Sequence, residues 1–255
     1  MEPGDVFSTK AKKYAKYRWR YAPLAIRTIF DVTRITAEWR VADIGAGTGI
    51  LTREFAGKVR QVVAVEPNAD MRRIARRELE PYPECQVLAG RAEAIPLADH
   101  HFDLICVAQA LHWFEPEAAR QELLRIVKPG GWLAILRNYG TDRELNEALA
   151  KIYPAGNDTA ALMVGRSQPS SFYYEGSNYL KQDFPFTLQA GWEEFIGALS
   201  TASNAPDEDS PRYADFERGA RRAFEEFSSD QQIELHGVTE LVLGKIEGGI
   251  EMNNQ

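Results

Sequence analysis

The chain has 255 residues, of which 44% are hydrophobic and 26% charged, and its formal net charge at pH 7 is −7. This composition is typical of a soluble globular protein and argues against a largely disordered chain. The acidic balance argues against nucleic acid as a partner, because phosphate binding needs a concentrated basic surface. No apolar run in the sequence approaches the ~20 residues of a membrane-spanning helix, so we expect no membrane partner.

The two cysteines, Cys85 and Cys106, are too few and too far apart for a disulfide framework or a metal cluster. Cys106 lies inside an apolar run, which is typical of a buried thiol. Residues 1–5 lack the basic start and apolar core of a secretory signal. We therefore expect a cytoplasmic protein without a bound metal.

The first 38 residues mix aromatic, basic and apolar residues at helical spacing, with Pro23 in the first turn of one helix. Short apolar segments then alternate with helical ones up to residue 137. The expected strands are 40–44, 62–65, 86–89, 102–108 and 132–136, and the expected helices are 50–58, 69–79 and 117–127. Because the strands are apolar throughout, the pattern indicates a parallel sheet covered on both faces.

The alternation of apolar strands and helices ends after residue 137. We expect helices over 141–151, 191–200 and 213–227, a strand over 184–189, and either one strand or a hairpin around Gly237 within 233–246. Residues 153–180 have an irregular composition, and the tail from 248 is expected to fray. The chain thus divides into a helical lid (1–38), an α/β core (39–137), a substrate cap with one edge strand (138–230), and the closing strand or strands with the tail (231–255).

The main motif is the turn Asp43-Ile-Gly-Ala-Gly-Thr-Gly49, which follows the first expected strand. Glycine permits a tight turn and the close approach of a ligand to the backbone. The third glycine comes one residue earlier than in the dinucleotide fingerprint, which disfavours a nicotinamide-dependent oxidoreductase. Taken alone, the turn also fits a purely structural connection between a strand and a helix.

Glu66 strengthens the ligand-binding interpretation of this turn. It ends the second expected strand, 17 residues after Gly49. Carboxyl ends of parallel strands meet at one edge of a sheet, and a carboxylate there can accept two hydrogen bonds from a ribose diol. The alternative is a solvated acid near the start of the following helix, at which Asn68 is a plausible N-cap.

Five motifs in register together resemble the class I S-adenosylmethionine (SAM) dependent methyltransferases. They are Val41-Ala-Asp-Ile-Gly-Ala-Gly-Thr-Gly49, Val65-Glu-Pro67, Gly90-Arg-Ala-Glu-Ala-Ile-Pro-Leu97, Phe102-Asp-Leu-Ile105 and Leu124-Arg-Ile-Val-Lys-Pro-Gly-Gly131. The chain is similar to the small-molecule branch that includes ubiquinone-biosynthesis and trans-aconitate methyltransferases. The resemblance covers residues 40–137 and implies a doubly wound, mostly parallel, seven-stranded Rossmann-like sheet with a helical cap inserted after the fifth strand.

The resemblance also implies which residues bind SAM and its product S-adenosylhomocysteine (SAH). The glycine turn would wrap the methionine part, Glu66 would hold the ribose hydroxyls, and the segment after the third strand would meet the adenine edge through its backbone. The residues implied are Asp43, Gly45, Ala46, Gly47, Gly49, Glu66, Pro67, Asn68, Ala92 and Glu93. Many relatives have aspartate at the position of Arg91, and arginine cannot accept a hydrogen bond from the adenine amino group.

The segment Ala108-Gln-Ala-Leu-His-Trp-Phe114 follows the fourth expected strand, close to the expected position of the transferable methyl group. Gln109 could bond the amino-acid part of SAM. His112 is a candidate general base, because its unperturbed pKa is about 6.5. The alternative is a histidine that packs against neighbouring aromatic residues.

The resemblance implies that the basic and aromatic segment from Lys10 to Arg20 folds over the cofactor as a lid. We expect Tyr14, Tyr17 or Arg18 near the SAM carboxylate, which suits an arginine geometrically. A solvated amphipathic helix and a nucleic-acid patch are the alternatives.

The sequence therefore predicts an enzyme that transfers a methyl group from SAM to a small organic acceptor, at a carbon, nitrogen or oxygen nucleophile or a carboxylate. The alternatives are a SAM-binding protein without catalysis and a macromolecule methyltransferase on the same fold. No Asn-Pro-Pro-Tyr type motif, usual in enzymes that methylate nucleic-acid amino groups, follows the fourth expected strand.

Overall fold

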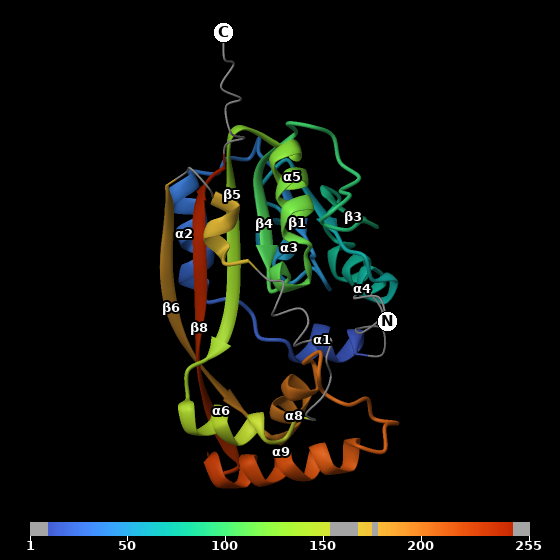
Figure 1. The fold of residues 1–255 in the computed structure, drawn as a ribbon, viewed down its shortest axis with the longest axis vertical. Helices are drawn as coiled ribbons and strands as arrows, with labels where there is room; N and C mark the ends of the chain where they lie inside the picture. Colours follow the sequence, from blue (N-terminus) through green and yellow to red (C-terminus); the bar gives the residue numbers. More distant parts are fainter. Residues whose placement is uncertain (1–9, 154–167, 175–177, 247–255) are drawn as a thin grey trace.

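A single twisted sheet runs through the protein, whose computed structural model describes residues 10–153, 168–174 and 178–246 (Figure 1). The strand order is β3-β2-β1-β4-β5-β8-β6, and the short β7 also pairs with β8. The first five are parallel, whereas β8 runs antiparallel to β5 and β6. The strands are β1 (Arg40–Ile44), β2 (Gln61–Val65), β3 (Cys85–Leu88), β4 (Phe102–Ala108), β5 (Val127–Gly140), β6 (Tyr179–Ala190), β7 (Ser228–Ser229) and β8 (Gln232–Lys245).

Helices cover both faces of the parallel part of this sheet. Neighbouring strand residues alternate between two apolar clusters: Val41 and Val62 belong to one, and Ala42 and Val63 to the other. This double burial explains why the strands are apolar throughout and confirms the doubly wound fold predicted from the sequence. The helices of this part are α2 (Pro23–Thr33), α3 (Thr52–Phe55), α4 (Ala69–Leu79) and α5 (Pro116–Ile126).

Local signals fix where two of these helices begin. The Oδ1 atom of Asn68 accepts a hydrogen bond from the Met71 N–H at 2.8 Å, so Asn68 caps α4 as predicted. Glu115 caps α5 in the same way, with Pro116 in the first turn. In contrast, α3 is shorter than the expected 50–58 because the chain turns at Gly57, whose φ is +72°.

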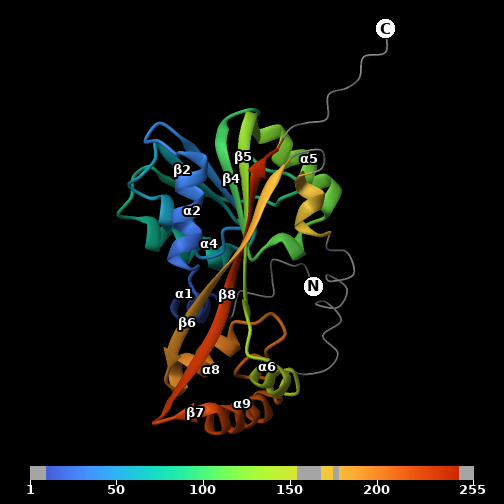
Figure 2. The ribbon, with the colours of Figure 1, turned by 90° about the vertical axis from the view of Figure 1, so that its left-hand side faces the viewer.

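Three strands of the sheet extend well beyond the layered part (Figure 2). Pairing between β5 and β8 continues to Gly140 opposite Gly237, and β6 pairs with β8 from Tyr179 to Ala190. The expected strands 132–136 and 184–189 were therefore too short. Residues 232–245 form one strand, which excludes the hairpin considered around Gly237.

Among the described residues, three helices pack around the far end of these long strands: α6 (Arg143–Ala150), α8 (Trp192–Ser200) and α9 (Tyr213–Phe227) (Figure 2). They share a small core whose buried members include Phe195, Phe224 and Leu235. This helical cap follows the fifth strand, as the resemblance implied. Much of the irregular segment 153–180, the tail from 248 and residues 1–5 lie outside the described residues.

The first described helix, α1 (Ala11–Tyr17), bridges the layered part and the cap (Figure 1). On one side Ala11 packs with Met71 and Ile74 of α4. On the other side the buried Lys10 Nζ donates to the Ala202 carbonyl oxygen at 2.9 Å, just after α8. The chain before β1 is thus held across the carboxyl ends of the parallel strands.

Candidate functional site

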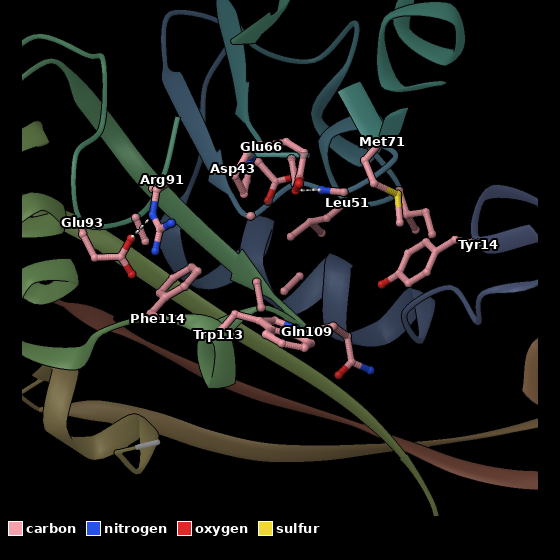
Figure 3. Close-up of a pocket in the computed structure, with 18 of the residues that line it drawn as sticks. Tyr14, Asp43, Leu51, Glu66, Met71, Arg91, Glu93, Gln109, Trp113 and Phe114 are labelled. Carbon is pink, nitrogen blue, oxygen red and sulfur yellow. Dashed lines mark hydrogen bonds and ion pairs between the residues drawn. The ribbon is translucent and has the colours of Figure 1, made fainter. Parts of the chain in front are cut away.

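A cavity that we call the main cavity lies at the carboxyl ends of β1, β2 and β4 (Figure 3). It contains about 960 Å³ of space not filled by protein atoms, its open mouth included. Its lining includes ten of the residues predicted to bind SAM: Tyr14, Asp43, Gly45, Ala46, Gly47, Glu66, Pro67, Ala92, Glu93 and Gln109.

The glycine turn after β1 adopts a conformation that favours glycine. Gly45, Gly47 and Gly49 have φ values of +72°, +58° and +84°. A Cβ atom at Gly45 would lie 2.5 Å from the Cβ atom of Ala110, so this glycine is also required for packing. A Cβ atom at Gly47 would contact the Tyr14 ring at 3.8 Å, at the cavity wall, whereas Gly49 packs against Leu79 of α4 and does not line the cavity.

Glu66 directly follows β2, is only 7% exposed, and joins two backbone segments. Its Oε2 atom accepts from the Gly47 N–H at 2.9 Å, and its Oε1 atom accepts from the Asn68 N–H at 2.8 Å. Burial raises the pKa of Glu66, and these two hydrogen bonds partly offset the effect. The carboxylate is thereby held in one orientation at the cavity wall, and Asn68 acts as a helix cap without lining the cavity.

Asp43 is the second carboxylate of the cavity and is 1% exposed. Its Oδ2 atom accepts from the Thr52 hydroxyl at 2.6 Å, whereas its Oδ1 atom is buried without a hydrogen-bond partner among the described residues. Burial raises the pKa of Asp43 to about 6, and the Glu66 carboxylate adds to the effect. An orphaned buried oxygen at a cavity wall is suited to a hydrogen-bond donor on a ligand.

The wall beyond β3 contains the unexpected arginine. Arg91 and Glu93 form an ion pair at 3.3 Å, and Glu93 also accepts from the Glu115 N–H at 2.8 Å (Figure 3). Trp113 and Phe114 face this wall from the turn after β4. Together with Ala92, Leu51 and Met71 they provide apolar surface for a flat ring.

Gln109 occupies a strained position between three hollows. Its φ of +57° is unusual for a residue with a side chain, and such strain concentrates at functional sites. Its N–H donates to the Leu136 carbonyl oxygen at 3.0 Å, and its Nε2 atom donates to the Asn138 carbonyl oxygen at 3.0 Å. It lines the main cavity and two adjoining hollows, one toward α8 and one over β5, β8 and β6.

The remaining predicted site residues line these adjoining hollows. Tyr17 and Arg18 face the hollow toward α8, where the Arg18 guanidinium lies 5.3 Å from the centre of the Tyr14 ring. His112, in the short helix η1 (Leu111–Trp113), faces the hollow over the sheet. Sequence reasoning missed Tyr21, Ile50, Leu51, Met71, Arg91, Ala108, Ala110, Trp113 and Phe114 as lining residues.

The surroundings of His112 keep its ring neutral at pH 7. Protein packed beneath the ring lowers its pKa to about 4, and the nearby Arg18 and Arg137 guanidiniums contribute in the same direction. The residue is nevertheless exposed, because the hollow that it lines is open to solvent. A neutral, accessible imidazole can accept a proton.

Comparison with known proteins agrees with this geometry. The methyltransferase domain family matches residues 42–135. An uncharacterized methyltransferase of Mycobacterium tuberculosis is 35% identical over 179 residues, which cover 68% of this chain and 71% of the relative. The chain belongs to the class I SAM-dependent methyltransferases.

One further sequence relative and two solved structures are similar to this methyltransferase. The demethylmenaquinone methyltransferase of Renibacterium salmoninarum is 31% identical over 163 residues, which cover 62% of this chain and 63% of the relative. The YcgJ protein of Bacillus subtilis shares the fold at a TM-score of 0.59 and 19% identity, covering 89% of this chain and all of its own. The [4+2]-cyclase SpnF shares it at 0.57 and 18% identity, covering 96% and 95%.

Two further properties concern the described residues only. Within 10–153, 168–174 and 178–246, no helix has the length and apolar character needed to cross a bilayer. The same part of the chain contains no group of three or more His, Cys, Asp or Glu residues that could hold a metal ion.

Proposed function

We propose that this methyltransferase transfers a methyl group from SAM, bound in the main cavity, to a small organic acceptor. The observation that carries the proposal is the convergence of Asp43, Gly47 and Glu66 on one cavity from the ends of two parallel strands. Ligands of open α/β sheets bind at this edge. The relatives named as quinone-biosynthesis methyltransferases support a small-molecule acceptor.

The cavity has the chemistry that SAM requires. The Glu66 carboxylate would accept from the ribose hydroxyls, because its two backbone bonds leave further lone pairs. The unpartnered Asp43 oxygen would accept from a donor of the methionine part, directly or by orienting the turn. The adenine would lie against Ala92, Trp113 and Phe114, and its edge would meet the backbone there rather than the Arg91 side chain.

The segment around α1 would close the cavity. Tyr14 lines it directly, and Arg18 lies over the Tyr14 ring in the adjoining hollow. We therefore assign Arg18 to the SAM carboxylate, with Gln109, which lines both hollows, between them. Because α1 contacts both α4 and α8, the lid and the cap would exclude water from the site together.

SAM supplies the methyl group on a sulfonium centre, which becomes the neutral sulfide of SAH when an acceptor nucleophile takes the methyl carbon. The protein contributes mainly by positioning the two reactants in line. An alcohol, phenol or amine acceptor also loses a proton, and the candidate base is the neutral ring of His112, which is a weak base because its pKa is about 4. A carboxylate acceptor is already ionised at pH 7 and needs no base.

Calorimetric titration tests the cofactor directly. The full chain should bind SAM and SAH but not NADH, and Glu66→Ala should weaken both sulfur nucleosides sharply. Glu38→Ala is the matched control, because the Glu38 side chain is 82% exposed in a surface ion pair with Arg60. A folded protein that binds neither nucleoside would refute the proposal. Binding without turnover of any acceptor would instead indicate a SAM-binding protein without catalysis.

A further inference from the structure

The hollow over the sheet has a polar floor that the cofactor does not require. It adjoins the main cavity at Gln109 and Ala110, which line both. Its roof is the turn that contains His112, and its floor is the shared face of β5, β8 and β6. We call it the acceptor hollow and define it by Gln109, His112, Tyr179, Lys181, Arg137 and Glu240.

Two cations and one carboxylate form the floor. Arg137 on β5 lies opposite Glu240 on β8 in the strand register, and their side chains pair at 3.3 Å. Lys181 on β6 pairs with the other oxygen of Glu240 at 2.8 Å. The Glu240 side chain is only 9% exposed, whereas those of Arg137 and Lys181 are 61% and 58% exposed. The cations therefore present their free donors to solvent above a buried carboxylate.

The lining of the acceptor hollow contains two cations, Arg137 and Lys181, and one carboxylate, Glu240. A second carboxylate, Asp183, lies opposite Glu240 in the strand register just outside this lining, where it accepts from the Tyr139 hydroxyl at 3.2 Å and also acts on Lys181. The charged groups that act on the His112 ring within the described residues are the guanidiniums of Arg18 and Arg137. Arg137 and Lys181 nevertheless face the hollow with side chains that are 61% and 58% exposed, whereas Glu240 beneath them is buried. Exposed cationic donors of this kind suit an anionic group on a ligand.

We propose that the acceptor hollow binds the methyl acceptor, and that the acceptor is a small organic acid whose carboxylate is held by Arg137 and Lys181. The inference rests on the proposed function, because it places the acceptor beside SAM at Gln109. A guanidinium can bind a carboxylate through two parallel hydrogen bonds, which fixes the orientation of the acid as well as its position. The exposed donors of Arg137 and Lys181 are available for this without breaking their contacts to Glu240.

The reacting atom of the acid then lies toward the Gln109–His112 turn, at the junction with the main cavity. There a lone pair of the nucleophile forms the new bond to the methyl carbon, and the electron pair of the broken carbon–sulfur bond stays on sulfur. Where the nucleophile is a hydroxyl or amine, its proton passes to His112 or to water. Where it is a carboxylate oxygen, no proton is released.

The test measures binding of simple acids to the full-length enzyme saturated with SAH. The probes are benzoate and cinnamate, and benzamide and cinnamamide are uncharged probes of matched shape. The acids should bind in the millimolar range or tighter, and the amides at least fivefold more weakly. Arg137→Gln should weaken the acids about tenfold, since a hydrogen bond between charged groups contributes at least that much to affinity.

A second variant distinguishes charge from structural damage. Glu240→Gln keeps the size of the side chain but frees both cations, so it should strengthen binding of the acids by a few-fold, opposite to Arg137→Gln. Arg143→Gln is the control, because Arg143 is an exposed arginine of α6 paired with Glu147, away from the hollow. It should leave acid binding unchanged.

Each other outcome overturns the inference. The inference fails if the amides bind as well as the acids, or if the wild type does not bind the acids at millimolar concentration. It also fails if Arg137→Gln and Glu240→Gln both weaken acid binding. Binding of phenyl phosphate but not of the carboxylates would replace the acid by a phosphate ester. SAH affinity is measured first for every protein. If the wild type does not bind SAH, the proposed function is refuted. If it binds SAH but does not prefer acids to amides, only the proposed acceptor class is refuted.

Discussion

The Oε2 atom of Glu66 accepts a hydrogen bond from the Gly47 N–H at 2.9 Å, which ties the end of β2 to the glycine turn after β1. The same carboxylate accepts from the Asn68 N–H through Oε1 at 2.8 Å. One side chain therefore positions two of the backbone segments that line the main cavity, and it faces the cavity itself. This relationship makes Glu66 a positioning residue as well as a proposed ribose ligand.

Glu66→Gln should therefore lower SAH affinity although the side chain keeps its size. A glutamine has one acceptor oxygen, so its amide NH₂ must face one of the two N–H groups. We expect a loss of at least about tenfold, the equivalent of one hydrogen bond to a charged group. Calorimetry measures it, with Glu38→Gln as the surface control. An affinity within twofold of the wild type would show that neither bond contributes.

Gly45→Ala should destabilise the protein and close part of the cavity. Its Cβ atom would lie 2.5 Å from the Cβ atom of Ala110, and the residue has a φ of +72°. Gly57→Ala is the matched control, because Gly57 has the same φ with no heavy atom within 4 Å of the added Cβ. We expect both variants to lose about 1 kcal/mol from backbone strain, and Gly45→Ala to lose ~1–3 kcal/mol more from overpacking. Equal losses in urea unfolding would contradict the packing role of Gly45.

Asp43 should make the protein less stable as the pH rises from about 4 to 6. Its pKa is about 6 in the folded protein against an ordinary value of 3.8, so the unfolded chain ionises first. Below both values the group contributes nothing to the pH dependence, and between them each unit of pH favours the unfolded state. The loss should reach roughly 2–3 kcal/mol at neutral pH.

Asp43→Asn removes this titration at constant size. The free energy of unfolding of the variant, measured in urea at several pH values, should fall less steeply than that of the wild type between pH 4 and 6. Parallel curves would show that Asp43 ionises as readily in the folded protein as in the unfolded chain.

His112 should act as a neutral group throughout the physiological range. Because its pKa is lowered to about 4, the turnover number should show no inflection near pH 6.5 from this residue. If His112 is the base, His112→Ala should lower kcat by about 100-fold for an acceptor that loses a proton, with SAM affinity unchanged within twofold. An unchanged kcat would show that the histidine only packs against Trp113.

Gly197→Ala should displace the lid although alanine favours a helix. A Cβ atom at Gly197 of α8 would lie 2.5 Å from the Tyr17 ring of α1. By helix propensity alone, alanine would stabilise the helix by about 1 kcal/mol. A net decrease in the free energy of unfolding would therefore be due to the clash with Tyr17. SAH affinity should fall several-fold, because Tyr14 on α1 lines the main cavity.

The double variant that combines Gly197→Ala with Tyr17→Leu is the control for this clash. The smaller side chain makes room for the added methyl group, so the double variant should recover most of the SAH affinity lost by Gly197→Ala. If Gly197→Ala binds SAH as tightly as the wild type, the contact between α1 and α8 does not hold the lid in place.

Much of the fold was predictable because its signals are local. The first, second and fourth strands lie within one residue of the expected ranges, and Asn68 caps α4 as expected. These strands are buried on both faces, so their apolar runs end where burial ends. The lengths of β5 and β6 were not predictable, because their extensions are set by pairing with β8 from a distant part of the chain.

The sequence by itself determined the family, the parallel core and the glycine turn with its partner acid, since spacing along the chain places these residues at one edge of the sheet. Only the tertiary structure decided that Glu66 bonds to Gly47, that Arg18 and His112 face separate hollows, and that Arg137, Glu240 and Lys181 lie side by side. Those three residues come from three strands far apart in sequence. Their meeting depends on the register in which β5, β8 and β6 pair, and these strands come from distant parts of the chain.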